Sequence, residues 1–307
     1  MVSSCMCTQA QLTSPEFYKW KKIFASALPH RGLCDAVGRP IVHRKLWEWC
    51  FIAEALNQHG MLAPGKKGLG FAVGKEPLPA AFAGFGCDIL ATDLETGSAE
   101  QKGWVRTDQH SASLEALNGD GMMDDETFRE RVTFQFVDMN AIPPELQNGQ
   151  FDFVWSSCSM EHLGSLGHGI DFVKHAMKCL RRGGIAVHTT EFNVASNDET
   201  IESGETVLYR RRDLQALATW LAGRGHALKL DFTPGSLPGD NHVDVPPYKT
   251  LPHLKIQLGR HVTTSYGMII RKCTSRSHGA NGSISSRFGP ISRFFANLVA
   301  KTATSKA

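Results

Sequence analysis

The sequence lacks several features that would assign it to a class of protein at once. No apolar run approaches the roughly 18 residues that a membrane-spanning helix needs. There is no internal repeat, and the net charge of +3 over 307 residues is too weak to indicate nucleic-acid binding. We therefore expect no membrane-spanning helix and no nucleic-acid partner.

The cysteines also lack the spacing of a metal site. All eight are scattered along the chain without a Cys-x-x-Cys pair, and no second pair of ligands follows Cys5 and Cys7 at zinc-site spacing. Residues 1–22 have no apolar central region, so they do not resemble a secretory signal. We expect a cytoplasmic protein with reduced thiols and no metal.

What the sequence does have is an alternation of short apolar runs with helical segments. Strands are predicted over residues 68–73, 87–93, 131–138, 151–159, 185–192 and 227–232. Helices are predicted over residues 77–85, 169–184 and 210–226. This alternation predicts parallel pairing in a layered α/β fold. The runs 253–259 and 263–272 are too close together for a helical crossover, so at least one should be an antiparallel edge strand.

Three regions are predicted along the chain. Residues 1–60 form an N-terminal helical cap region, in which residues 40–60 carry apolar side chains at helical spacing. Residues 61–273 form the main domain. Residues 274–307 form a basic tail without acids, whose apolar residues have the spacing of an amphipathic helix. Such a helix is compatible with peripheral membrane contact, and equally with docking onto the domain or a partner chain.

The most informative stretch is Gly68-Leu-Gly-Phe-Ala-Val-Gly74, at the end of the first predicted strand of the main domain. Glycine is needed where the backbone approaches a ligand closely or adopts a positive φ angle. A loop of this kind between a strand and a helix directs amide groups toward a nucleotide. The same residues are also compatible with a tight turn that binds nothing.

Acidic residues follow at the ends of the next strands. Asp93 ends one strand, where its carboxylate can accept hydrogen bonds from two ribose hydroxyls. Asp138 ends the next, where its carboxylate could accept from an adenine amino group, and Glu161-His162 follow the strand after that. Four features in order, at the carboxyl ends of successive strands, indicate a nucleotide site more specifically than any one alone.

With these motifs, residues 60–235 resemble the class I S-adenosylmethionine-dependent methyltransferases. The resemblance implies a Rossmann-like three-layer sandwich, a mostly parallel seven-stranded sheet with an antiparallel edge strand, and S-adenosylmethionine as cofactor. Residues 61–273 would then be a cofactor-binding methyltransferase domain. The cofactor-binding residues that the resemblance implies are Gly68, Gly70, Gly74, Glu76, Asp93, Leu94, Asp138, Met139 and Ser156.

The glycine motif departs from the family pattern at two positions. That pattern usually reads acid-x-Gly-x-Gly-x-Gly; here Gly68 replaces the acid and Ala72 replaces the middle glycine. The acid often binds the amino group of the cofactor's methionine. Glu76, just after the loop, could take its place.

Candidates for chemistry lie after later strands. Methyl transfer from a sulfonium is an in-line displacement, so a protein mainly aligns the reactants, and a base is needed only for an acceptor hydroxyl of high pKa. His162 and Glu191 are the catalytic candidates, although hydrogen bonding to the loop or helix capping would also explain them. The predicted substrate contacts are Asn193, Tyr209, Arg211 and His242.

The acceptor is predicted from a wider similarity. Segments such as YRRRDL and HLKIQLG are similar to bacterial methyltransferases associated with surface-glycan synthesis, which implies O-methylation of a small-molecule or glycan acceptor. Two alternatives stay open. An NAD(P)-dependent oxidoreductase can have a similar loop, although Gly-x-Gly-x-x-Gly is missing here. A non-catalytic binding subunit can share the scaffold. The sequence indicates no oligomeric state.

Overall fold

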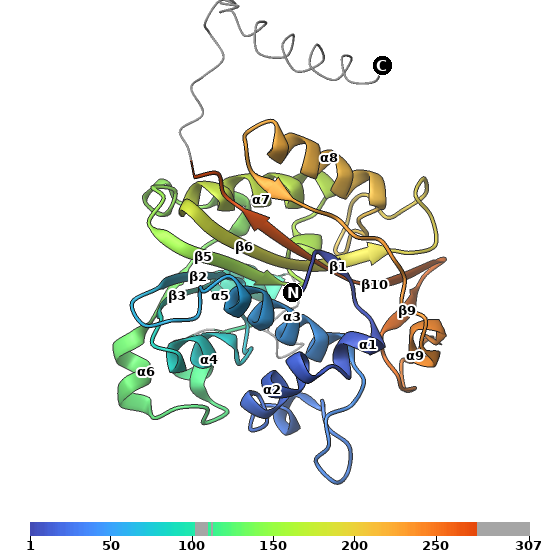
Figure 1. The fold of residues 1–307 in the computed structure, drawn as a ribbon, viewed down its shortest axis with the longest axis horizontal. Coiled ribbons are helices and arrows are strands. Elements are labelled where there is room, and N and C mark those ends of the chain that lie inside the picture. Colours follow the sequence, from blue (N-terminus) through green and yellow to red (C-terminus); the bar gives the residue numbers. More distant parts are fainter. Residues whose placement is uncertain (102–109, 112, 275–307) are drawn as a thin grey trace, which may run out of the picture. The chain divides into compact units, whose positions relative to one another are not determined.

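The computed structural model describes residues 1–101, 110–111 and 113–274, and the structural statements below concern these residues (Figure 1). They lie in one compact unit, Met1–Ser275. The predicted cap and main domain are therefore not separate bodies. The predicted amphipathic helix of the tail lies outside the described residues. In the part of the chain described, no helix is both long and apolar enough to span a bilayer.

The fold is built around one ten-stranded sheet, with the strand order β4-β3-β2-β5-β6-β10-β9-β8 and with β1 and β7 also paired to β10. The strands from β2 to β6 pair in parallel, which confirms the predicted α/β class. The strands are β1 (Cys5–Met6), β2 (Lys67–Phe71), β3 (Asp88–Asp93), β4 (Val132–Phe136), β5 (Phe151–Ser157), β6 (Leu180–Asn193), β7 (Ala227–Leu228), β8 (Val243–Asp244), β9 (Lys255–Leu258) and β10 (His261–Arg271).

Beyond β6 the sheet continues with antiparallel pairing, as predicted, up to β9, and the short outermost strand β8 pairs with β9 in parallel. The long strand β10 pairs with β6 and therefore lies inside the sheet. Its outer side is covered in turn by β9, by β1 and by β7. The resemblance implied seven strands, and the described residues contain ten because short strands complete this edge.

Helices cover both faces of the sheet, giving the expected three layers. Successive side chains of a strand point to opposite faces, and β5 shows the division: Phe153 and Trp155 join one apolar core, whereas Val154 joins the other. The first core contains residues of α3 and α4, and the second contains residues of α7 and α8. The helices are α1 (Gln9–Leu12), α2 (Pro15–Ile23), α3 (Arg44–Gln58), α4 (Leu78–Gly84), α5 (Thr96–Gln101), α6 (Asp125–Arg131), α7 (Leu166–Cys179), α8 (Arg211–Ala222) and α9 (Pro238–Asn241).

Two predicted boundaries are wrong. The helix predicted over residues 169–184 ends at Cys179, and β6 already begins at Leu180. The glycines expected to stop the helix belong to this strand, near an irregularity in its pairing with β5. The strand predicted over residues 227–232 shrinks to the two residues of β7, because it pairs only with Ile270 and Arg271 at the end of β10.

Candidate active site

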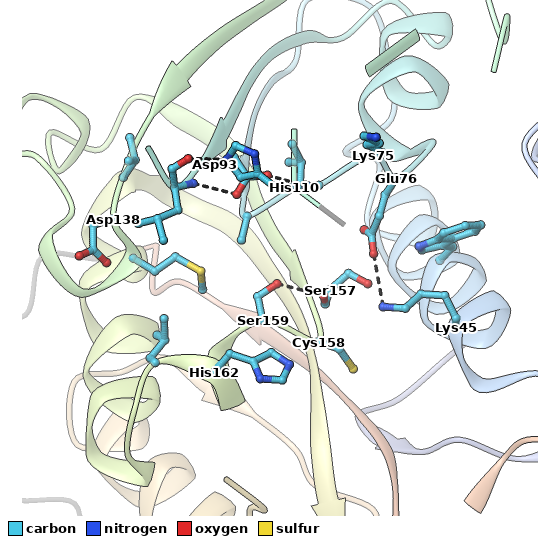
Figure 2. Close-up of a pocket in the computed structure, with 18 of the residues that line it drawn as sticks. Lys45, Lys75, Glu76, Asp93, His110, Asp138, Ser157, Cys158, Ser159 and His162 are labelled. Carbon is cyan, nitrogen blue, oxygen red and sulfur yellow. Dashed lines mark hydrogen bonds and ion pairs between the residues drawn. The ribbon is translucent and has the colours of Figure 1, made fainter. Parts of the chain in front are cut away.

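A cavity of about 320 Å³ lies at the carboxyl ends of the parallel strands β2, β3, β4 and β5 (Figure 2). Ligands bind at this end of the strands in open α/β sheets. The N-terminal part of the chain closes another side, through residues of α3 and the segment before it. The lining consists of Arg31, Lys45, Trp49, Ala72, Val73, Gly74, Lys75, Glu76, Asp93, Leu94, His110, Val137, Asp138, Met139, Ser157, Cys158, Ser159, His162 and Leu163.

The turn after β2 forms one wall of this cavity. Its backbone is left-handed at Ala72 and at Gly74, with φ angles of 46° and 52°. Glycine adopts such angles without strain, whereas alanine does not. The Val73 amide donates to the Thr92 carbonyl, and the Gly74 amide donates to the Asp93 carboxylate. The turn is thereby fixed to the end of β3.

The first two glycines of the motif have a packing role. A Cβ atom on Gly68 would lie 2.4 Å from the Phe153 ring, and one on Gly70 would lie 2.4 Å from the Trp155 ring. Neither glycine lines the cavity. Ser156 does not line it either: it is buried, and its hydroxyl is 2.8 Å from His188 Nδ1. The structure therefore does not bring these three predicted cofactor residues to the cavity.

Asp93 lies at the centre of the cavity wall and already accepts three backbone hydrogen bonds. The Leu94 amide donates to Oδ1, and the amides of Gly74 and Ser111 donate to Oδ2. Burial raises the pKa of Asp93, and these amide donors oppose that effect. A carboxylate has about four acceptor positions. Asp93 can thus accept one more hydrogen bond, where the sequence predicted that it accepts two from ribose.

Asp138 and Met139 line the cavity beside Asp93, after the neighbouring strand β4. Met139 is buried, whereas Asp138 is exposed and holds its loop by accepting the Asn140 amide at Oδ1, 2.8 Å away. Its second carboxylate oxygen can therefore face a ligand. With Leu94, which follows β3, these residues provide two apolar side chains beside an acid, which suits a flat base with an amino group.

Glu76 enters the cavity from the turn after β2. Its Oε1 lies 3.4 Å from Lys45 Nζ, and its buried Oε2 has no hydrogen-bond partner of good geometry among the described residues, although the Trp49 and Ser157 side chains lie close enough to lower the pKa of Glu76. Burial raises the pKa of Glu76, while the Lys45 cation lowers it. A buried acceptor without a donor is costly unless a ligand supplies one. The arrangement fits a ligand with a cationic donor.

His162 faces the cavity from the short 3-10 helix Met160–His162. Its Nδ1 lies 2.8 Å from the Glu205 carbonyl oxygen. That oxygen can only accept, so Nδ1 carries the proton and Nε2 is the basic nitrogen. Burial lowers the pKa of His162, which keeps the ring neutral.

A buried polar cluster lies behind Cys158. The donor atoms of Cys158, Glu161 and Glu191 all lie within 4.8 Å of one another. Arg44 pairs with Glu191 at 2.5 Å, and Thr190 donates to Glu161. Burial and repulsion from Glu191 raise the pKa of Glu161 to about 8. Arg44 supplies positive charge to Glu191 in this cluster, and the buried Oε1 of Glu161 has no hydrogen-bond partner among the described residues.

The remaining predicted residues lie away from the cavity. Glu191 is buried under α3 in the cluster just described, and the Tyr209 hydroxyl bonds to the Met160 and Leu166 carbonyls. Asn193 and Arg211 line a different cavity of about 480 Å³. His242 bonds to Thr250. None of these predicted catalytic or substrate residues lines the site described above.

Several lining residues were missed by the sequence reasoning. Lys45 and Trp49 lie on the helix before the first strand of the main domain, a position that often covers the pocket in this fold, so a signal existed. Cys158 directly follows β5, and its positive φ of 43° marks a constrained position. Arg31 and His110 lie in irregular segments, and no sequence pattern marks them.

No protein-family model matches the chain, and no curated protein matches it. Solved structures with a similar fold include a Galdieria sulphuraria protein assigned as a sarcosine dimethylglycine methyltransferase (14% identity, TM-score 0.47, covering 73% of this chain and 84% of that one). A second is the magnesium protoporphyrin IX methyltransferase of Synechocystis with bound S-adenosylhomocysteine (14% identity, TM-score 0.45, covering 86% of this chain and 97% of that one). A third is a phosphoethanolamine N-methyltransferase of Haemonchus contortus (15% identity, TM-score 0.40, covering 72% of this chain and 44% of that one). These likenesses concern the fold, and the activity is argued from the cavity itself.

Proposed function

We propose that this chain is an S-adenosylmethionine-dependent methyltransferase that acts on an oxygen of a small or saccharide-like acceptor. One observation carries the proposal: Glu76, Asp93 and Asp138 meet in a single cavity at the carboxyl ends of neighbouring parallel strands. Three acids at these positions match a ligand with an ammonium group, ribose hydroxyls and an amino-substituted base. The volume is at the lower end of ordinary ligand pockets, about 300–1,000 Å³.

The residues present fit this cofactor. Asp93 has one acceptor position left for a ribose hydroxyl, and Asp138 has a carboxylate oxygen for the base amino group. The unpartnered Oε2 of Glu76 fits the ammonium group of the methionyl part. Gly68 cannot be an acid in this fold, because Phe153 fills the space beside it. Glu76 thus supports the proposal at the position where the family's acid is missing.

The chain's own contribution to the chemistry is alignment and proton transfer. When bound, the cofactor supplies a methyl group on a sulfonium centre. Ser159 and His162 provide hydrogen-bonding groups around the remaining part of the cavity, which suits a hydroxylated acceptor. His162 Nε2 accepts the proton of the acceptor hydroxyl as the oxygen–methyl bond forms. The low pKa of His162 keeps this nitrogen unprotonated at neutral pH.

The proposal is tested by binding and by transfer. Calorimetric titration should show binding of S-adenosylmethionine and none of NADPH. A labelled-methyl screen over sugars, nucleotide-sugars and lipid-linked glycans should give a product with the wild type and much less with Asp93→Ala. Binding of NADPH would favour an oxidoreductase. Binding of neither compound would favour a non-catalytic subunit, and methylation of nitrogen or carbon would refute the O-methylation part.

A further inference from the structure

The strongest unexplained feature near the site is a pair of opposite charges on α3, the partly buried Lys45 and the buried Glu48, which lies behind the Glu76 carboxylate. Lys45 Nζ is 2.7 Å from Glu48 Oε2. It is also 3.4 Å from Glu76 Oε1, a contact drawn in Figure 2. Glu48 is fixed in turn, because the Ser265 hydroxyl of β10 donates to its Oε1 at 2.5 Å. A chain of contacts therefore runs from the sheet through α3 to Glu76.

We propose that Lys45, held by Glu48, is a positioning residue that turns the Glu76 carboxylate so that Oε2 receives the ammonium group of the methyl donor. The inference rests on the proposed function and adds to it the means by which the donor's amino group is recognised. The acid of the family motif would stand at Gly68, on the sheet. Here the carboxylate comes from the far side of the turn and is oriented by a helix of the N-terminal region.

Three observations support this division of roles. Lys45 occupies Oε1 and leaves Oε2 as the oxygen without a partner. Lys45 also lines the cavity, but its ammonium is shared between two carboxylates, so it serves them rather than a free anion. Finally, Gly68 has no room for a side chain, so the sheet offers no acid for this task.

Charge explains why a lysine is needed. Glu76 is 14% exposed, and its burial favours the neutral carboxyl group, which would not bind an ammonium well. The charged groups that face it are Lys45 and Glu48, both from α3, with Trp49 and Ser157 as polar neighbours; Arg31 contacts the adjoining backbone at Lys75. Lys45 lowers the pKa of Glu76 and Glu48 raises it. Without Lys45, Glu76 would remain protonated to a higher pH.

The test compares two probes that differ in the recognised group. S-adenosylhomocysteine carries the ammonium group, whereas 5′-methylthioadenosine keeps the adenosine and the sulfur but lacks the amino-acid part. In the wild type, S-adenosylhomocysteine should bind more tightly. Lys45→Met and Glu76→Gln should each weaken it by about 10- to 100-fold, the range for a charge-assisted hydrogen bond, and should leave methylthioadenosine nearly unchanged. Retained methylthioadenosine binding also shows that the variant is folded.

Further readouts separate positioning from a structural role. The double variant should bind S-adenosylhomocysteine no worse than Glu76→Gln alone, since both changes remove one interaction. Raising the pH should restore part of the preference in Lys45→Met, as Glu76 ionises, but none in Glu76→Gln. Lys66→Met is the matched control: Lys66 pairs with Asp152 outside the cavity and should leave both affinities as they are.

The outcomes distinguish the two proposals. A wild type that binds neither probe would refute the proposed function. A wild type that prefers S-adenosylhomocysteine, together with a Lys45→Met variant that keeps this preference, would overturn only the role of Lys45. Additive losses in the double variant would also overturn it. Should Lys45→Met fail to fold, Lys45→Gln removes the same charge and is measured in the same way, with the same expected loss.

Discussion

Gly68→Ala is expected to destabilise the fold without affecting the ligand. The added Cβ would lie 2.4 Å from Phe153 Cζ and 2.9 Å from Ile89 Cδ1. Phe153 cannot move away easily, since it is fully buried, stacks on Trp155 at 5.8 Å and meets the Phe82 ring at 5.9 Å. The substitution therefore acts on the core of the sheet.

The magnitude follows from two opposing effects. Overpacking a well-filled core costs about 1–3 kcal/mol, and a contact this short against a fixed ring belongs near the upper end. Alanine in a strand regains about 0.5–1 kcal/mol relative to glycine. We expect a net loss of about 2 kcal/mol in the free energy of unfolding.

Urea unfolding of Gly68→Ala and of Gly84→Ala measures this effect. Gly84 is the matched control, because a Cβ there meets nothing within 4 Å and the variant should be at least as stable as the wild type. Phe153→Leu opens space beside residue 68, so the double variant should lose less than the sum of the single losses. The affinity for S-adenosylhomocysteine should stay unchanged. A Gly68→Ala variant of wild-type stability, or one that loses the ligand while staying stable, would refute the packing role.

Three other substitutions test the turn, the ribose acid and the buried cluster. Ala72→Gly should raise the free energy of unfolding by about 0.5 kcal/mol in urea titration. The reason is that it relieves about 1–2 kcal/mol of strain from the left-handed backbone, which outweighs the conformational entropy that glycine adds to the unfolded chain. The control Ala222→Gly, at the exposed end of α8, should lower the free energy of unfolding. Asp93→Asn should lower the calorimetric affinity for S-adenosylhomocysteine by at least about tenfold and reduce thermal stability, since an amide oxygen cannot accept three backbone amides and a ligand. The folded-state pKa of Glu161 is raised from 4.5 to about 8, so as the pH rises the unfolded chain loses this proton before the folded chain does. The free energy of unfolding should therefore fall by up to about 1.4 kcal/mol for each pH unit of increase between those two values. Glu161→Gln should remove that slope in urea unfolding at pH 5.5, 7 and 8.5, and an unchanged slope would contradict the assignment.

The layers of the fold were predictable because each has a periodic signal. The helix expected over residues 40–60 is α3, and the close runs 253–259 and 263–272 became the antiparallel hairpin of β9 and β10. The rest of the edge was not predictable. β1, β7 and β8 have two residues each, too few for any alternation of apolar and polar side chains. Their places are fixed by pairing with distant residues, such as Cys5 opposite Gly267.

The site was predictable where a side chain lies at, or within two residues of, the carboxyl end of a short parallel strand. Asp93 and Asp138 met in one cavity because the carboxyl ends of β3 and β4 lie at the same edge of the sheet. The same reasoning was wrong for Glu191, which does not line the cavity. It lies within β6, opposite Ser265 of β10, and there it pairs with Arg44 under α3 instead of reaching the cavity. The sequence shows where an apolar run ends, but the strand continues for as long as a neighbour pairs with it.

The glycine motif shows why a pattern can locate a site correctly while its residues have other roles. Gly68 and Gly70 allow the aromatic rings of β5 to lie against β2, and this close packing is what brings the strand ends together. Only Gly74 forms part of the cavity wall. An acid at position 68 is incompatible with Phe153, so a carboxylate for the ligand must come from outside the sheet. In the proposed site, Glu76 in contact with Lys45 provides that carboxylate, so that α3 of the N-terminal region forms part of the site rather than a cover over it.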